Sequence, residues 1–419
     1  MSNIGPNFED LEQEQDFTFQ ATSFLDKIVR KGAQDMLQAA LEAEVQAFLE
    51  RHQDKKTQAG LQRIVRNGQQ PSRKILTGAG QLDIKRPRVR NRQPDPSNPA
   101  TFSSAILPKY LRRSKNLDEL IPWLYLKGVS TGDFSEALSA LVGPAAKSLS
   151  KDTVVRLKDK WSQEYDLWSR RKLEGEAFVY VWADGVYFNI RLEEDRQCIL
   201  VLLGVKLDGT KELLAVQPGY RESEQAWYEV LIDLKQRGLP EPPKLAIGDG
   251  ALGFWAALRK VWPETKEQRC TVHKTRNVLD KLPKSVHTRA KAGLHEIFNA
   301  PTKEEAGKAF DSFVEKYQAK YPKATACLEK DREVLLTFFD FPAEHWIHIR
   351  STNAVESVFA TVRLRHRRTK GNGSARACLA MVFKLCQSAS RNWRKIMGFR
   401  QLPDVIAGVQ FRDGVRIAA

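Results

Sequence analysis

Two aspartates occupy positions where a carboxylate needs a specific reason to be present. Asp184 interrupts a near-continuous apolar run at residues 178–188, which predicts a central strand buried on both faces. Asp249 closely follows a short apolar run at residues 245–247. A buried carboxylate costs several kcal/mol unless a cation or a full set of hydrogen bonds compensates it. A metal ion could do so, but so could a Lys or Arg partner, and Asp249-Gly250 also suits a turn or a helix N-cap.

A third carboxylate, Glu356, stands at the start of a helix predicted to run through Phe359 and Val362. Asn353 precedes it by three residues, and this capping-box spacing would explain the glutamate by helix entry alone. Basic residues without a nearby acid follow, as expected for a helix that lies beside a DNA strand: Arg363, Arg365, Arg367, Arg368 and Lys370. Both interpretations of Glu356 stay open on the sequence.

Three converging carboxylates would suit phosphodiester transfer. That chemistry uses two divalent cations about 4 Å apart, one activating the attacking water or 3′-hydroxyl and one stabilising the leaving oxygen. Oxygen ligands favour Mg²⁺, and ligands from different elements must meet to bridge the pair. If Asp184, Asp249 and Glu356 converge, they could hold two Mg²⁺ ions, with Mn²⁺ as a substitute.

Strand patterns surround the two aspartates. Residues 178–188, 198–207 and 213–217 predict three strands in antiparallel order, with a tight turn at Asp208-Gly209, followed by a helix at 224–237 and a strand at 245–247. This order is typical of an α/β, ribonuclease-H-like domain and would place the aspartates on adjacent strands. From residue 278 to about 343 the periodicity is helical.

The N-terminal part combines helical and ribbon-like patterns. Residues 1–20 are acidic and predict a flexible lead-in, whereas residues 24–51 predict a long amphipathic helix whose apolar stripe needs either the rest of its domain or a second protomer. Two short strands around a glycine turn, at 74–77 and 81–85, predict a basic β-ribbon. Residues 86–90, leading into Pro94, Pro96 and Pro99, predict an extended basic arm and linker.

Three apolar-periodic segments at 117–126, 134–141 and 153–168 follow, in the layout of a helix-turn-helix. Ser150 is a plausible N-cap for the third. Generic packing of three short helices explains the same pattern, but the neighbouring basic segment favours DNA recognition. The residues predicted to contact DNA are Arg73, Lys74, Lys85, Arg86, Arg88, Arg90, Lys151, Arg156, Arg363 and Arg367.

The length of 419 residues predicts two or three domains. The net charge of +16 indicates a polyanionic partner, and residues 51–95 alone hold twelve Lys or Arg against three Asp. Five scattered cysteines without a C-x-x-C pair argue against a disulfide framework and fit a reducing compartment. Since apolar stretches are short and the first residues are acidic, we expect no membrane span and a cytoplasmic protein of a bacterium, associated with its nucleoid.

An ordered set of short motifs runs through the second half of the chain. Its members are Glu222-Ser223, Trp227, Leu231, Leu234, Arg237-Gly238, Asp249-Gly250, Gln268-Arg269-Cys270, His273, Arg276-Asn277, Thr352-Asn353 and Glu356-Ser357. In this order they resemble the motifs of Mutator-type bacterial insertion-sequence transposases, and the likeness covers most of the chain. One departure is Arg350-Ser351, where the family usually has an aromatic residue or threonine; it affects the expected target preference and not the chemistry.

The resemblance implies a metal-binding acidic triad, which maps onto Asp184, Asp249 and Glu356, and an all-helical insertion before the last of them. It also includes the signature Cys270-x-x-His273. Two ligands are too few for a structural zinc site, which needs four. We therefore expect an active-site scaffold that consists of Cys270, His273, Arg276, Asn277 and Asn353.

The function implied is that of a transposase that binds the terminal inverted repeats of its element and cuts and joins double-stranded DNA. Water would cut the ends, the freed 3′-hydroxyls would attack target DNA directly, and a homodimer or larger assembly would hold both ends. The alternatives are a DNA-binding regulator that does not cut and an RNA-processing nuclease on the same fold. The expected domains are a lead-in (1–20), a helix with basic ribbon and arm (21–96), a helix-turn-helix domain (97–172), the first catalytic part (173–280), a helical insertion (281–345), the last catalytic helices (346–400) and a tail (401–419).

Overall fold

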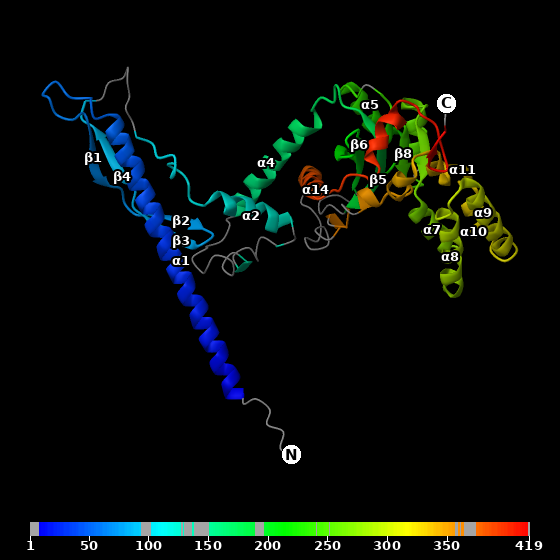
Figure 1. Cartoon of the computed structure of the whole chain (residues 1–419), viewed down its shortest axis with the longest axis horizontal. Coiled ribbons are helices and arrows are strands. Elements are labelled where there is room, and N and C mark those ends of the chain that lie inside the picture. Colours follow the sequence, from blue (N-terminus) through cyan, green and yellow to red (C-terminus); the bar gives the residue numbers. More distant parts are fainter. Residues whose placement is uncertain are drawn as a thin grey trace, which may run out of the picture. The chain divides into compact units, whose positions relative to one another are not determined.

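The computed structural model describes residues 8–93, 102–126, 129, 136–137, 151–188, 197–239, 241–250, 252–356, 359–360, 362–363 and 374–417 (Figure 1). The chain divides into two compact units, Met1–Val154 and Val155–Ala419. Within the described ranges, no helix combines the length and the apolar character needed to cross a membrane.

The first unit joins a long helix to two antiparallel strand pairs. Its described elements are α1 (Phe8–Arg51), β1 (Ile64–Gln69), β2 (Arg73–Thr77), β3 (Gly80–Ile84), β4 (Pro87–Asn91) and α2 (Lys115–Leu126). β1 pairs with β4 and β2 with β3, and the second pair is the ribbon that the sequence predicts. Its apolar side chains pack with those of α1 and the chain before α2 in one small core: Leu41, Ile75, Leu82, Ile84 and Leu107.

Two predictions for this unit are wrong. The lead-in predicted as flexible is helical from Phe8 onward, because its acidic residues favour a helix N-terminus and Leu, Glu and Gln are good helix formers. The segment predicted as an extended basic arm contains β4, which pairs with β1. A strand whose partner lies about twenty residues earlier leaves no local signal that would separate it from an extended arm.

The predicted helix-turn-helix is described only in its outer parts. α2 and α4 (Lys151–Ser169) correspond to the first and third predicted helices. Most of the middle segment, together with Ser150, lies outside the described residues. The turn geometry that defines the motif therefore stays a prediction.

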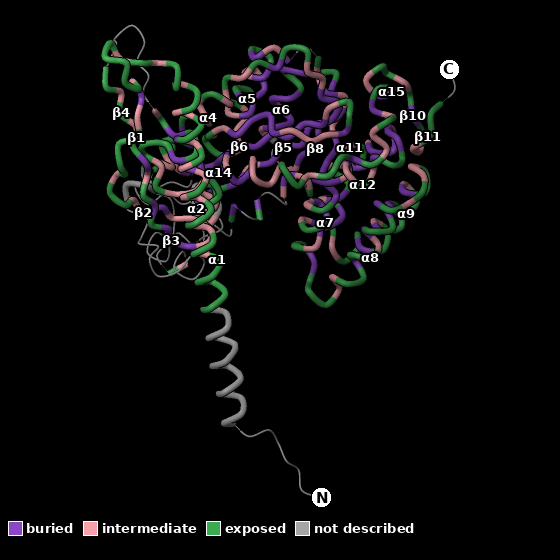
Figure 2. Tube along the Cα trace, turned by 60° about the vertical axis from the view of Figure 1, so that its left-hand side comes forward, coloured by how far each residue is buried: buried purple, intermediate pink, exposed green. Residues whose placement is uncertain are grey.

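A five-stranded sheet organises the second unit. Its elements up to the last strand are β5 (Phe178–Phe188), β6 (Gln197–Lys206), β7 (Lys211–Gly219), α5 (Glu224–Gln236), β8 (Leu245–Gly248), α6 (Leu252–Val261) and β9 (Lys266–Arg269). The strand order is β7-β6-β5-β8-β9, with β5, β6 and β7 antiparallel and β8 and β9 parallel to β5. The apolar side chains of α5 and α6 pack on this sheet, among them Trp227, Leu231, Phe254 and Leu258. Figure 2 shows buried residues following the central strands.

A helical segment connects β9 to the region of Glu356. It contains α7 (Thr271–Leu279), η1 (Lys284–Val286), α8 (His287–Phe298), α9 (Lys303–Gln318), α10 (Pro322–Glu329), α11 (Arg332–Leu335), η2 (Thr337–Asp340), η3 (Ala343–His345) and α12 (Trp346–Ile349). Residues 281–345 contain helices and turns and no strand, as the helical periodicity predicts. The segment leaves the sheet at β9, directly beside β8, the strand that Asp249 follows.

The C-terminal region is folded, which corrects the prediction of a tail. After α14 (Ala375–Ser390) come η4 (Phe399–Gln401), α15 (Leu402–Ile406) and the short pair β10 (Phe411–Arg412) and β11 (Val415–Arg416). Leu402, Val405 and Phe411 are buried. The amide of Gly414 donates to the carbonyl of Phe339 at 3.2 Å, so these last residues pack against the helical segment.

Candidate active site

The register of the central strands brings the two aspartates together. β5 and β8 are parallel, and the last pair in register is Ala183 with Gly248. Asp184 follows Ala183, and Asp249 follows Gly248. Asp184, inside β5, and Asp249, directly after β8, therefore lie side by side.

Asp184 is a buried carboxylate, with 7% of its surface exposed. Its carboxylate accepts a hydrogen bond from the amide of Gly185 at 2.9 Å. Burial, and then the negative charges of Asp249 and Glu222, raise the pKa of Asp184 to about 7, although the nearby His273 opposes this shift. Such a group is a candidate metal ligand, because a cation would relieve both the burial and the repulsion.

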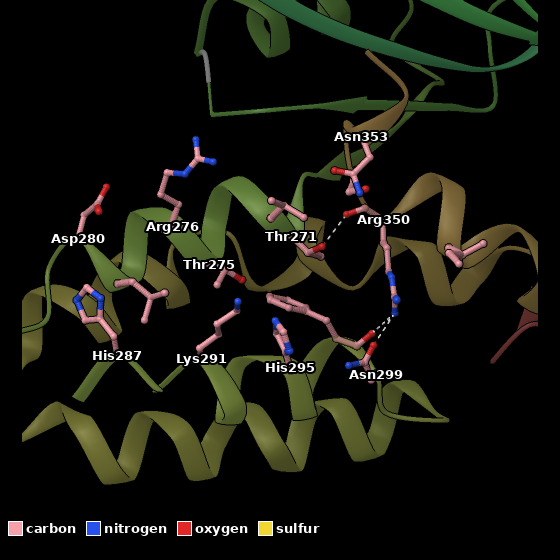
Figure 3. Close-up of a pocket in the computed structure, with 15 residues that line it drawn as sticks. Thr271, Thr275, Arg276, Asp280, His287, Lys291, His295, Asn299, Arg350 and Asn353 are labelled. Atoms are coloured by element: carbon pink, nitrogen blue, oxygen red, sulfur yellow. Dashed lines mark hydrogen bonds between the residues drawn. The ribbon is translucent and has the colours of Figure 1, made fainter. Parts of the chain in front are cut away.

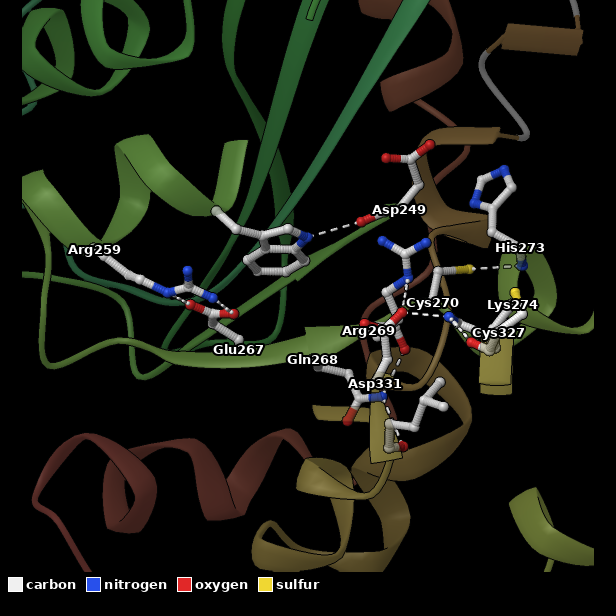
Figure 4. Close-up of polar contacts among 12 residues, drawn as sticks. Asp249, Arg259, Glu267, Gln268, Arg269, Cys270, His273, Lys274, Cys327 and Asp331 are labelled. Carbon is white, nitrogen blue, oxygen red and sulfur yellow. Dashed lines mark hydrogen bonds and ion pairs between the residues drawn. The ribbon is translucent and has the colours of Figure 1, made fainter. Parts of the chain in front are cut away.

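Asp249 lies in the turn between β8 and α6, and contacts with Trp255 and Arg269 fix this turn. The indole of Trp255 donates to the Asp249 carbonyl at 2.9 Å (Figure 4). A Cβ on the next residue, Gly250, would overlap the guanidinium of Arg269. Arg269 in turn pairs with Asp331 at 3.3 Å, which ties this turn to the helical segment.

Glu222 is a fourth carboxylate at the site, and the sequence interpretation did not assign it a role. It lines an open groove of about 580 Å³ together with Asp249 and Asn277. A Cβ on Gly185 would overlap its side chain, so the glycine beside Asp184 is what allows Glu222 to approach. Burial and the charge of Asp249 raise the pKa of Glu222 to about 7. Its presence among the motif residues was the one signal that could have identified it.

Cys270 forms a hydrogen-bonded junction at the start of α7. Its sulfur accepts from the amide of His273 at 3.5 Å and from the amide of Thr352 at 3.3 Å, and the Thr352 hydroxyl oxygen also lies 3.3 Å from it. Burial alone would raise the pKa of the Cys270 thiol, but the hydrogen bonds from His273 and Thr352 outweigh it and lower this pKa. The junction joins α7 to the chain that enters Glu356.

Glu356 is held by the same junction. The hydroxyl of Thr352 donates to the Glu356 carboxylate at 3.1 Å, and the His273 Nε2 lies 3.4 Å from that carboxylate. The hydrogen bond between His273 and Cys270, and then the charges of Cys270, Asp184 and Glu356, raise the pKa of His273 to about 9, although burial opposes this shift. The negative charges of Asp184 and Glu356 thus both act on His273.

The capping-box explanation of Glu356 is wrong. The helical residues begin at Asn353, so Thr352 precedes the helix. The amide of Glu356 donates to the Thr352 carbonyl at 3.1 Å, and Val355 donates to the same carbonyl. Glu356 is therefore one residue too far along to cap this helix, and its side chain contacts Thr352 and His273 instead.

The site contains two groups of candidate ligands, the pair Asp184 and Asp249 and the trio Cys270, His273 and Glu356. The ligand atoms of Cys270, His273 and Glu356 lie within 4.8 Å of one another, and no other trio of His, Cys, Asp or Glu in the described chain is so compact. The sulfur already accepts hydrogen bonds from two backbone amides, whereas the carboxylates of Asp184 and Asp249 repel each other. Oxygen ligands that carry like charges are what Mg²⁺ or Mn²⁺ would stabilise.

The remaining predicted site residues are placed in different surroundings. Arg276 and Asn353 are exposed, and Asn277 lines the groove of Glu222. Of the predicted DNA contacts, Arg73 donates to the carbonyls of Pro108 and Leu111, and Arg86 is half-buried. The exposed members are Lys74, Lys85, Arg88, Arg90, Arg156 and Arg363, whereas the side chain of Lys151 and all of Arg367 lie outside the described structure.

His345 and His348 pack against the central strand β5. The Tyr180 hydroxyl lies 2.7 Å from His345 Nδ1, and the Trp182 indole donates to the His348 carbonyl at 3.1 Å. These contacts attach the strand that carries Asp184 to the segment that leads to Glu356.

The chain belongs to the Mutator family of transposases, because the family model described as "Transposase, Mutator family" matches residues 7–396. The resemblance seen in the sequence motifs is thereby confirmed.

Curated relatives agree with this assignment. The chain is 48% identical to the transposase for insertion sequence element IS6120 of Mycolicibacterium smegmatis, over 71% of this chain and 92% of the relative. It is 51% identical to the transposase for IST2 of Acidithiobacillus ferrooxidans, over 67% of this chain and 95% of the relative. Among solved structures, the Drosophila P element transposase strand transfer complex aligns with 70% of this chain and 85% of its own at 10% identity, with a TM-score of 0.27 that supports no inference.

Proposed function

We propose that the second unit is a ribonuclease-H-like catalytic domain in which Asp184, Asp249 and Glu356 bind two Mg²⁺ ions, with Mn²⁺ as a substitute. The observation that carries this proposal is the β5–β8 register, which puts a buried aspartate beside a second one. When bound, the metals would activate the attacking oxygen and stabilise the leaving one.

The proposed reaction has two steps on DNA. Water bonds to the phosphorus at an end of the element, the bond from phosphorus to the 3′-oxygen breaks, and that oxygen takes up a proton. The freed 3′-hydroxyl then loses its proton, bonds to a phosphorus of the target DNA and displaces the target's 3′-oxygen, which takes up a proton. Neither step forms a bond between protein and DNA.

The protein side chains have separate tasks in this scheme. Asp184 and Asp249 approach from the sheet, and Glu356 approaches from the helical side. Cys270 and Thr352 hold Glu356 in place through the hydrogen bonds described above. The DNA would be the terminal inverted repeats, bound in part by the exposed basic residues of the first unit, and a homodimer or larger assembly would hold two ends.

End cleavage and strand transfer on the element's own terminal DNA test the proposal. With Mg²⁺ or Mn²⁺ we expect Asp184→Asn, Asp249→Asn and Glu356→Gln each to reduce cleavage by about a hundredfold or more, while binding of the ends persists. Normal cleavage by Glu356→Gln would place the third ligand elsewhere, with Glu222 as the first candidate. A wild type that binds and never cuts would be a regulator, and one that prefers RNA–DNA hybrids would be an RNA-processing nuclease.

A further inference from the structure

A second cavity lies between α7 and α8 (Figure 3). It has a volume of about 590 Å³ and is bounded by α7, α8 and residues 347–353. Thr271, Thr275 and Leu279 recur at steps of four and line it, whereas His273 contacts Glu356 and Asn277 lines the groove with Glu222. One helix therefore forms a wall of both spaces.

Cationic and polar side chains converge in this cavity. Lys291 and His295 extend from α8 toward α7 (Figure 3). Neither side chain forms a hydrogen bond or ion pair with another described residue. Arg350 lies at the same wall and donates to the Phe298 carbonyl and the Asn299 amide oxygen, both at 2.9 Å. Asp280, directly after the last residue of α7, is the one carboxylate among the lining residues.

Apolar surface completes the lining. Phe298, Leu279, Val272 and Ile347 contribute to it, and the last two are exposed to the extent of 38% and 58%. Cations beside an apolar and aromatic surface match the two halves of a nucleotide, a phosphate and a base. The volume falls in the range of about 300 to 1,000 Å³ that small organic ligands occupy.

We propose that this cavity binds one unpaired nucleotide of the DNA strand being processed, with its phosphate at Lys291 and His295 and its base on the apolar lining. This inference rests on the proposed function. Thr271 and Asn353 line the cavity, and their chain neighbours Cys270 and Thr352 hold Glu356. A nucleotide bound here would thus lie across α7 from the cut site, and the few kcal/mol that unstacking it costs would be offset by the cavity contacts.

Two DNA probes and the full-length protein test the proposal. One probe is the terminal duplex with 2-aminopurine placed in turn at each position around the cut, and the other is a labelled single-stranded oligonucleotide. The variants are Lys291→Glu and His295→Ala. The matched control is Lys323→Glu, which makes the same charge change at an exposed position of α10 that does not line the cavity.

We expect the wild type and Lys323→Glu to brighten 2-aminopurine at one position, and both cavity variants to abolish this signal. Lys291→Glu should also weaken oligonucleotide binding about tenfold, against less than about twofold for the control. Equal binding by Lys291→Glu and Lys323→Glu, or cleavage by the wild type without any brightening, would overturn the proposal. So would competition by micromolar free deoxynucleotide, which would identify a free nucleotide as the ligand. If the wild type never cuts but Lys291→Glu alone weakens oligonucleotide binding, the cavity assignment stands and the proposed chemistry falls.

Discussion

At the level of single residues, the repulsion among the site carboxylates should control how stability responds to pH. The pKa of Asp184 rises from 3.8 to about 7 on folding. Because the folded state binds this proton more tightly than the unfolded state, the contribution of Asp184 to the free energy of unfolding is greatest below its unfolded pKa of 3.8. This contribution is lost as the pH rises through its folded pKa of about 7. In metal-free protein we therefore expect the free energy of unfolding to fall between pH 5 and pH 7.5, and to fall less in Asp184→Asn. Denaturant unfolding in a chelator measures both slopes, and equal slopes would contradict the prediction.

Cys270 should act by positioning Glu356. Cys270→Ala removes the acceptor of two backbone hydrogen bonds, from the amides of His273 and Thr352. We expect a loss of about 1–3 kcal/mol in unfolding free energy and about a tenfold loss of cleavage. The control Cys327→Ala changes a sulfur on α10, outside the site.

The pKa of His273 distinguishes positioning from simple packing. Cys270 makes the largest contribution that raises this pKa. NMR titration should therefore show a lower His273 pKa in Cys270→Ala and no change in Cys327→Ala. An unchanged pKa together with normal cleavage would mean that Cys270 only fills space.

At the level of elements, the contact between α5 and α6 positions Glu222. A Cβ on Gly253 would overlap backbone atoms of Glu222, Ser223 and Glu224. Gly253→Ala should therefore push the two helix starts apart and cost about 1–3 kcal/mol of unfolding free energy. Thermal unfolding can compare it with Gly307→Ala in α9, where the Cβ meets only Arg332 at 3.6 Å and the change should stabilise by about 0.5–1 kcal/mol. A similar sign for both variants would refute the argument.

The elements also show what the sequence could predict and what it could not. The apolar run around Asp184 predicts a buried central strand, and the structure confirms it, because burial on both faces leaves a continuous local pattern. β4 was mistaken for an arm because its pairing with β1 depends on residues far along the chain. Glu222 was not assigned a role because it lies between β7 and α5, and only the close approach to Gly185 reveals its place. The junction of Cys270 with Thr352 likewise joins residues about eighty positions apart.

At the level of the whole molecule, α1 leaves an apolar surface without a partner in its described part. Five large apolar side chains of this helix are exposed: Phe24, Leu25, Ile28, Val29 and Met36. Phe24 and Ile28, like Leu25 and Val29, are four residues apart and so are neighbours on one face of the helix. A second copy of this helix would cover them, and two copies would suit the joining of two ends. We expect Ile28→Glu to convert a dimer into a monomer in light scattering without lowering the melting temperature, and Leu167→Glu, an exposed apolar position on α4, to leave the dimer intact. A dimer in both variants would place the interface elsewhere.

The net charge of +16 should make DNA binding depend steeply on salt. Arg88 and Arg90 lie on the exposed positions of β4. If both contact phosphates, replacing them with Gln should reduce the slope of log affinity against log salt concentration by about two. Lys31→Gln is the control, since Lys31 already pairs with Asp35 at 2.7 Å and its loss should change the slope little. Titrations of terminal DNA between about 50 and 200 mM salt measure these slopes. An unchanged slope in the double variant would move the phosphate contacts away from β4, and a flat response in the wild type would exclude electrostatic binding by the first unit altogether.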